Sequence, residues 1–199
     1  MALTLELAQT VAVGPFNSHI ITPEWLVRCN VLPEQEIQIR FGTIGDGTAF
    51  RFGKIEWQVN SRRLMVSTST LTEDCGDLVA KVLELLPHTP VRAVGHNFHF
   101  LCNSREEWRS SPVPALGTKE FGDFTDLVQS RWTGIFQKNG VRIELTIGYA
   151  DDGVVVLLNH HRITNTIEEA QEAARQFRRD LDVSRAYLGD LLKQELRDV

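Results

Sequence analysis

Histidines are the first side chains in this sequence that could do chemistry, and four of them form two close pairs. His96 and His99 are separated by two residues, whereas His160 and His161 are adjacent. Two correctly spaced histidines can bind a metal ion through their ring nitrogens. The residues from 91 to 102 favour a strand, in which positions three apart point to opposite faces, and so do adjacent positions. Neither pair is therefore expected to chelate one ion by itself.

Three interpretations of these histidines remain open. They can make structural hydrogen bonds, line a ligand pocket, or bind metal if one histidine from each pair meets in space, for example His99 with His160 or His161. No carboxylate lies beside either pair in the sequence. We therefore predict no metal site and no cofactor. The ligand-pocket hypothesis places a site near Asn97 and His99, with His161 as a third candidate residue.

Nucleophilic catalysis finds little support. The sequence has no Gly-x-Ser-x-Gly motif, and its three cysteines, Cys29, Cys75 and Cys102, are widely spaced. This spacing favours reduced thiols over a disulfide framework or a thiolate zinc site. Cys75 lies in the first turn of a predicted helix, which lowers a thiol pKa, but the nearby Glu73 and Asp74 act in the opposite direction. No catalytic residue is predicted, and the balance is against an enzyme.

Basic residues offer another hypothesis. Arg40, Lys54 and Arg62 could share an exposed sheet face and bind an anion or a nucleic-acid backbone. The interleaved Glu36 and Glu56 weaken this idea. The formal net charge of -5 also argues against nucleic acid as a partner, because such proteins usually present a concentrated basic face.

Hydrophobic periodicity predicts the elements that must position these side chains. Apolar and polar residues alternate, or apolar residues run together, at positions 3–13, 37–41, 55–59, 64–68, 91–102, 132–136, 141–149 and 154–158. Helices are predicted at 23–29, at 73–86 with a cap at Thr70 to Thr72, at 121–129 and at 167–196. Turns at Asn60-Ser61 and Asn139-Gly140 predict antiparallel hairpins.

The order of these elements predicts an α+β fold, with an antiparallel sheet and helices packed on one face. Residues 36–86 and 131–197 both follow the order strand, strand, strand, helix, so two related β-β-β-α halves are a hypothesis about the architecture. We expect one compact domain over residues 1–199. Its halves would be 1–102 and 120–199, joined by a loop at 103–119.

The predicted C-terminal helix carries an apolar stripe at steps of three and four. Its members are Ile167, Ala170, Ala174, Phe177, Leu181, Ser184, Leu188 and Leu191. Thr166 and Glu169 form a capping box at its start. A short polar link, residues 160–165, is expected before the helix, and Gly189 could bend it.

The second part of this helix has further apolar residues beside the stripe, which suggests a partner surface. The predicted interface residues are Tyr187, Leu188, Leu191, Leu192 and Leu196. The leading hypothesis is a non-enzymatic binding or assembly protein, a homo-oligomer or a subunit with a protein partner. The alternative is a helix that packs wholly within its own subunit.

The remaining expectations concern location. The longest purely apolar run is the five residues from Val154, too short to cross a membrane, and the first residues have no basic stretch typical of a secretion signal. A cytoplasmic protein is therefore predicted. The sequence does not indicate a biological role or a small-molecule ligand.

Overall fold

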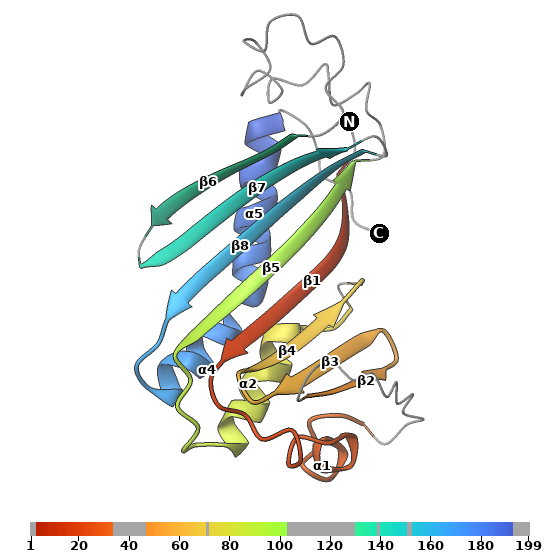
Figure 1. Ribbon diagram of the computed structural model, residues 1–199, viewed down its shortest axis with the longest axis vertical. Coiled ribbons are helices and arrows are strands. Elements are labelled where there is room, and N and C mark those ends of the chain that lie inside the picture. The colour runs from red at the N-terminus through yellow and green to blue at the C-terminus, as the bar shows by residue number, and fades with distance from the viewer. Residues whose placement is uncertain are drawn as a thin grey trace, which may run out of the picture.

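One antiparallel sheet of eight strands organises the protein (Figure 1). The computed structural model describes residues 3–33, 47–70, 72–102, 130–138, 140–150 and 153–192. The strands are β1 (Thr4–Val13), β2 (Thr48–Phe52), β3 (Ile55–Asn60), β4 (Arg63–Thr68), β5 (Ala93–Cys102), β6 (Ser130–Lys138), β7 (Val141–Ala150) and β8 (Gly153–Ile163). The helices are α1 (Pro23–Arg28), α2 (Cys75–Leu85), α4 (Ile167–Arg175) and α5 (Phe177–Leu192). Helices α2, α4 and α5 lie on one face of the sheet (Figure 1), so the predicted α+β class is confirmed.

The strand order is symmetric about the centre of the sheet. It runs β2-β3-β4-β1-β5-β8-β7-β6, so β1 and β5 pair in the middle and each half mirrors the other. Each central strand is followed along the chain by three more strands and a helix. Strand β5 thus occupies the place in the second half that β1 occupies in the first.

Local capping signals place two of the helices. Thr22 accepts a hydrogen bond from the Trp25 backbone N–H, with Pro23 at the first helical position, as predicted for α1. The predicted cap of α2 at Thr70 to Thr72 is wrong. Asp74 caps this helix instead, because its carboxylate accepts the backbone N–H of Asp77 at 3.0 Å.

Strand β2 was not predicted, because its five residues are too few to show a clear period. It pairs with β3, and Phe50 stacks on Trp57 with ring centroids 5.9 Å apart.

The predicted β3–β4 hairpin is confirmed. Asn60 Oδ1 accepts hydrogen bonds from the backbone N–H groups of Arg62 and Arg63. The predicted strand 37–41, loop 103–119 and helix 121–129 lie outside the described residues.

The predicted polar link at 160–165 is wrong, because β8 continues to Ile163. The last residues of β8 pair with the first residues of β5, Ile163 with Ala93 and His161 with Gly95. Both His160 and His161 therefore belong to a strand. The apolar run earlier in β8 has one covered face: Val154 is buried, whereas Val155 is 40% exposed.

The predicted single C-terminal helix is interrupted at Gln176, between α4 and α5, and Gly189 lies inside α5. A close tertiary contact lies beside this interruption. At Gly76 of α2, an added Cβ would overlap the Ala174 carbonyl oxygen and Phe177 Cβ, so three helical segments meet here with no room for a side chain. The predicted stripe is nevertheless buried at Ala170, Ala174, Phe177, Leu181, Ser184 and Leu188. Within the described part of the chain, no helix is long and apolar enough to span a membrane.

Candidate functional site

Two of the histidines meet in the core under the helices. Thr10 of β1, His96 of β5, His160 of β8 and Ile143 of β7 are successive cross-strand partners in one row. His96 and His160 are fully buried. The residues that meet from the two pairs are therefore these two, and not His99 with a member of the second pair.

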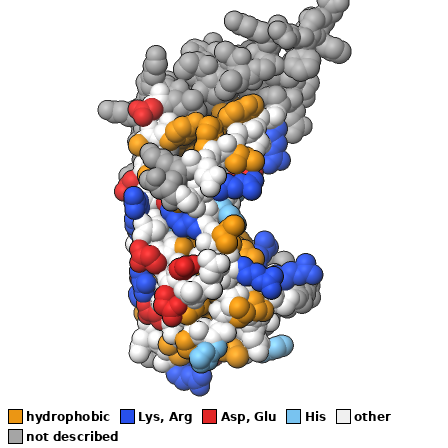
Figure 2. Space-filling view, turned by 90° about the vertical axis from the view of Figure 1, so that its left-hand side faces the viewer, with side chains coloured by type: hydrophobic (Ala, Val, Ile, Leu, Met, Phe, Trp, Pro, Cys, Tyr) orange, Lys and Arg blue, Asp and Glu red, His pale blue; other side chains and the backbone are white. Residues whose placement is uncertain are grey.

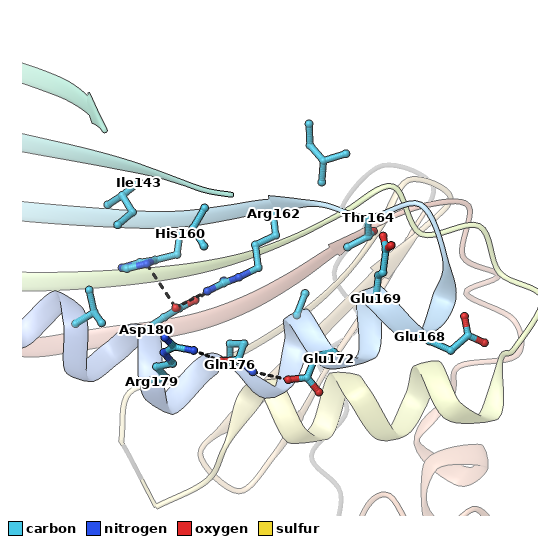
Figure 3. Close-up of a pocket in the computed structure, with 14 residues that line it drawn as sticks. Ile143, His160, Arg162, Thr164, Glu168, Glu169, Glu172, Gln176, Arg179 and Asp180 are labelled. Carbon is cyan, nitrogen blue, oxygen red and sulfur yellow. Dashed lines mark hydrogen bonds and ion pairs between the residues drawn. The ribbon is translucent and has the colours of Figure 1, made fainter. Parts of the chain in front are cut away.

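Asp180 of α5 lies against both histidines, and Figure 3 shows its contact with His160. Its Oδ2 is 2.7 Å from His96 Nδ1, and its Oδ1 is 3.7 Å from His160 Nδ1. The Arg162 guanidinium donates to both carboxylate oxygens, at 2.5 and 2.6 Å. The other ring nitrogen of His160, Nε2, is 2.7 Å from Ser184 Oγ. These contacts fasten α5 to β5 and β8 in the interior of the protein.

The charges of this cluster follow from its partners. Burial raises the pKa of Asp180, but hydrogen bonds from His96 and Arg162 outweigh it and hold the pKa at about 2. Burial lowers the pKa of His160 to about 4, against the attraction of Asp180. At neutral pH the carboxylate is ionised and His160 is uncharged. Because an ionised carboxylate only accepts hydrogen bonds, His96 Nδ1 must carry the proton that it shares with Asp180.

Ser184, His160 and Asp180 contact one another in the same succession as the members of a serine–histidine–aspartate triad. A substrate cannot reach them, however, because the serine is buried. A catalytic serine must reach a substrate carbonyl, whereas Ser184 is 0% exposed. The carboxylate is also committed to Arg162. The Cys75 thiol is no better as a nucleophile, because burial and then Asp74 raise its pKa to about 12.

No set of three or more histidine, cysteine or acidic side chains in the described ranges is placed to hold a metal ion. The reason is plain around Asp180. Both of its oxygens accept hydrogen bonds from a guanidinium, whose positive charge repels a metal cation from this carboxylate.

A groove of about 670 Å³ opens beside this cluster, between β7–β8 and α4–α5 (Figure 3). Its strand wall carries the apolar side chains of Val141, Ile143 and Ile163 beside the polar ones of His160 and Arg162. Its helix wall is polar and includes Glu168, Glu169, Glu172, Gln176 and Arg179. His160 and the Arg162–Asp180 ion pair close its inner side.

The predicted ligand residues Asn97, His99 and His161 all lie on the opposite, helix-free face of the sheet. Asn97 accepts a hydrogen bond from Asn159 Nδ2 at 2.5 Å and donates to Gln9 Oε1 at 3.4 Å, which gives a row of amides across three strands. His99 pairs in register with Leu157 and His161 with Gly95, so the two rings flank this row. They are about 13 Å apart along the strands at ~3.3 Å per residue and do not converge.

This helix-free face lies on the hollow side of the molecule, at the right in Figure 2. Burial lowers the pKa of His99, while the charge of Glu6 acts in the opposite direction. His99 is thus partly shielded from water.

The predicted interface residues separate into two groups. Leu188 is fully buried in the core of its own chain, whereas Tyr187 is 37% exposed. The side chains of Leu191 and Leu192, and all of Leu196, lie outside the described residues.

Tyr187 contacts Phe136 of β6, with ring centroids 6.0 Å apart. Phe136 is 41% exposed, as is Val183, one turn before Tyr187 on α5. We call Phe136, Val183 and Tyr187 the edge surface. Val183 also lines the groove, so the edge surface continues the groove toward the outermost strand.

The structure does not place Lys54 and Arg62, two of the residues predicted to bind an anion, close together. Lys54 lies in the turn between β2 and β3, and Arg62 lies in the turn between β3 and β4. These turns are at opposite ends of β3. Arg40 lies outside the described residues.

Sequence reasoning missed Asp180 and Arg162 as partners of the histidines. A signal for Asp180 was present, because it stands three residues after Phe177 and four before Ser184, on the predicted buried stripe of the helix. A charged residue on a buried stripe requires a buried partner. The sequence did not say which partner.

The chain matches no protein-family model, and a comparison with curated proteins finds no match.

Proposed function

We propose that the protein is a non-enzymatic binding or assembly protein that self-associates through the edge surface. The observation that carries the proposal is the exposed contact between Phe136 of β6 and Tyr187 of α5. Adjacent exposed aromatic and aliphatic side chains from two elements are typical of protein interfaces. The inaccessible Ser184 and the neutral, buried His160 argue against catalysis at the neighbouring cluster.

Strand β6 supports the same surface. It is the outermost strand at one end of the described sheet, and its outer edge has no partner strand among the described residues. It has nine residues and carries Trp132, Ile135 and Phe136, with Ile135 59% exposed. A long edge strand with exposed apolar side chains favours pairing with another strand.

The sequence of β6 favours a second copy as the partner. Antiparallel pairing centred on Gly134 would set Trp132 beside Phe136 of the other copy, and Arg131 beside Gln137. Aromatic cross-strand pairs are stabilising, and this register sets no like charges opposite one another. The two-fold axis of such a pair keeps both α5 helices on the same face of the joined sheet, where Tyr187 and Val183 could meet their counterparts.

Sedimentation equilibrium of the full chain tests the proposal. We expect twice the chain mass of 22.5 kDa for the wild type, and the monomer mass for Phe136→Asp. Leu85→Asp is the matched control, because Leu85 is 40% exposed but lies on α2, away from β6. It should remain dimeric. A monomeric wild type over the whole accessible concentration range would overturn the proposal.

A further inference from the structure

One cross-strand row on the helix side of the sheet contains buried polar atoms without hydrogen-bond partners. The row crosses β3, β4, β1 and β5 through Trp57, Val66, Thr10 and His96. In the described part of the chain, four buried side-chain nitrogen or oxygen atoms have no partner. Three of them belong to this row: Trp57 Nε1, Thr10 Oγ1 and His96 Nε2. Buried polar groups in native proteins nearly always bond to protein or to ordered water, so this grouping calls for a common explanation.

Thr10 and His96 are the adjacent members of this group. Both side chains are 0% exposed, and the two residues are direct partners across the β1–β5 pair. Directly opposite residues of antiparallel strands have Cβ atoms ~4.5–5.5 Å apart. The hydroxyl and the ring do not bond to each other, but a molecule as small as water can span two side chains at this separation. Val66 separates Thr10 from Trp57 in the row, so the indole is not part of the same site.

The hydrogen-bonding capacity of the two atoms matches water. His96 Nδ1–H donates to Asp180 Oδ2 at 2.7 Å, which leaves Nε2 to bond elsewhere. Nε2 accepts a hydrogen bond in the neutral ring and donates one in the charged ring. The Thr10 hydroxyl both donates and accepts. Because water also does both, it fits this pair in either protonation state of His96.

The surroundings of the pair offer no other polar side chain from β1 or β5. Residues two positions away on a strand share its face. At these positions the side chains are apolar and fully buried: Ala8, Ala12, Val94 and Phe98. A polar atom in such an environment is costly unless it is hydrogen-bonded, and internal waters typically occupy sites of this kind.

We propose that one internal water molecule bridges Thr10 Oγ1 and His96 Nε2. It extends the series of hydrogen bonds that runs from Arg162 through Asp180 to His96, and it adds β1 to that series. Strand β1 belongs to one half of the sheet, whereas β5 and β8 belong to the other. The water therefore joins the two halves where they meet. This site lies in the core and does not depend on self-association through the edge surface.

A high-resolution crystal structure of the full chain tests the site directly. We expect a water molecule ~2.7–3.2 Å from both Thr10 Oγ1 and His96 Nε2. Thr10→Val keeps the shape of the side chain and removes its hydroxyl. This variant should lack the water, and its melting temperature should be lower by at least about 2 °C, because His96 Nε2 loses its partner. Thr10→Ser retains the hydroxyl and should retain the water.

Side-chain ¹⁵N NMR supplies a check in solution. The Nε2 resonance of His96 should move in Thr10→Val and stay near its wild-type position in Thr10→Ser. His160 Nε2, which contacts Ser184, is the internal control and should not move in either variant. Three results would each overturn the proposal: no water between the two atoms in the wild type, a Thr10→Val protein at least as stable as the wild type, or an Nε2 resonance of His96 that this variant leaves unmoved.

Discussion

The two faces of the sheet carry polar residues at neighbouring positions of the same two strands, yet their surroundings differ. His96 and His160 point toward α5 and are fully buried against Asp180. The adjacent Asn97 and Asn159 point to the helix-free face, where they are half-buried. One face therefore holds a buried ionic cluster, and the other holds a row of amides that water can reach.

This difference determines how much each polar group contributes to the stability of the fold. A buried charge is costly unless it is paired, so removal of one member of the Asp180 cluster leaves the others without compensation. A half-exposed amide that loses its partner can bond to water instead. Similar residue types on neighbouring positions should thus respond very differently to substitution.

The largest effect is expected for Asp180→Ala. It would leave the Arg162 guanidinium and the His96 N–H unpaired in the core, at a cost of about 3–5 kcal/mol in the free energy of unfolding. Urea unfolding measures this loss. Asp182→Ala, exposed on the same helix, should change stability by less than ~0.5 kcal/mol. Equal losses of stability in the two variants would show that the ionic cluster does not stabilise the fold.

The second-largest effect is expected from acid, which should lower the free energy of unfolding through His160. The pKa of His160 is about 4 in the folded state and 6.5 as the reference value. Between these values the unfolded chain binds a proton that the folded protein does not, so stability falls as pH decreases from 6.5 to 4. The loss from His160 is about 3 kcal/mol at the lower end, since each pKa unit corresponds to ~1.4 kcal/mol.

Urea unfolding from pH 7 to pH 4.5 measures this slope. His160→Gln should flatten it, whereas His99→Gln should leave the His160 contribution in place. Asp180 adds a loss only below its reference value of 3.8, because its folded pKa is about 2. A slope unchanged by His160→Gln would contradict the assignment.

Two glycines, Gly76 and Gly95, allow the packing on the two faces of the sheet to be compared, with a smaller expected effect on stability. Gly76→Ala on the helix side should cost about 1–3 kcal/mol, because the new Cβ overlaps Ala174 and Phe177. At Gly95, on the helix-free face, the nearest atom to an added Cβ is His160 O at 3.6 Å. Gly95→Ala should therefore be tolerated. Thermal unfolding of the two variants compares them, and a larger shift for Gly95→Ala would count against this packing.

The smallest effect is expected for Asn97→Ala. Its hydrogen bonds to Asn159 and Gln9 are half-exposed, so the loss should be about 1 kcal/mol or less. A double-mutant cycle with Asn159→Ala in urea measures the coupling of the two amides. A coupling as large as the effect of Asp180→Ala would mean that the hollow face is not solvated as described.

Much of the fold could be predicted from local patterns. The alternation at 141–149 and the turn at Asn60-Ser61 are local signals, and they placed β7 and the β3–β4 hairpin correctly. Strand parity also placed His96 and His99 on opposite faces. These predictions need only the period of a strand or the chemistry of a turn.

The cluster could not be predicted in the same way, because it depends on long-range register. Asp180 is 84 residues from His96, and only the pairing of β5 with β8 sets His96 beside His160. The interruption of the last helix likewise lies against the distant Gly76, a contact that no pattern near Gln176 reveals. Sequence patterns thus located the buried stripe but not its ionic partners.

Hydrogen exchange of the β6 backbone amides at low and high protein concentration tests self-association through the edge surface most directly. Pairing of β6 with a second copy predicts that its outward-facing amides exchange more slowly at high concentration. In Phe136→Asp they should exchange rapidly at both concentrations. Exchange rates in β6 that do not depend on concentration in the wild type would contradict the account.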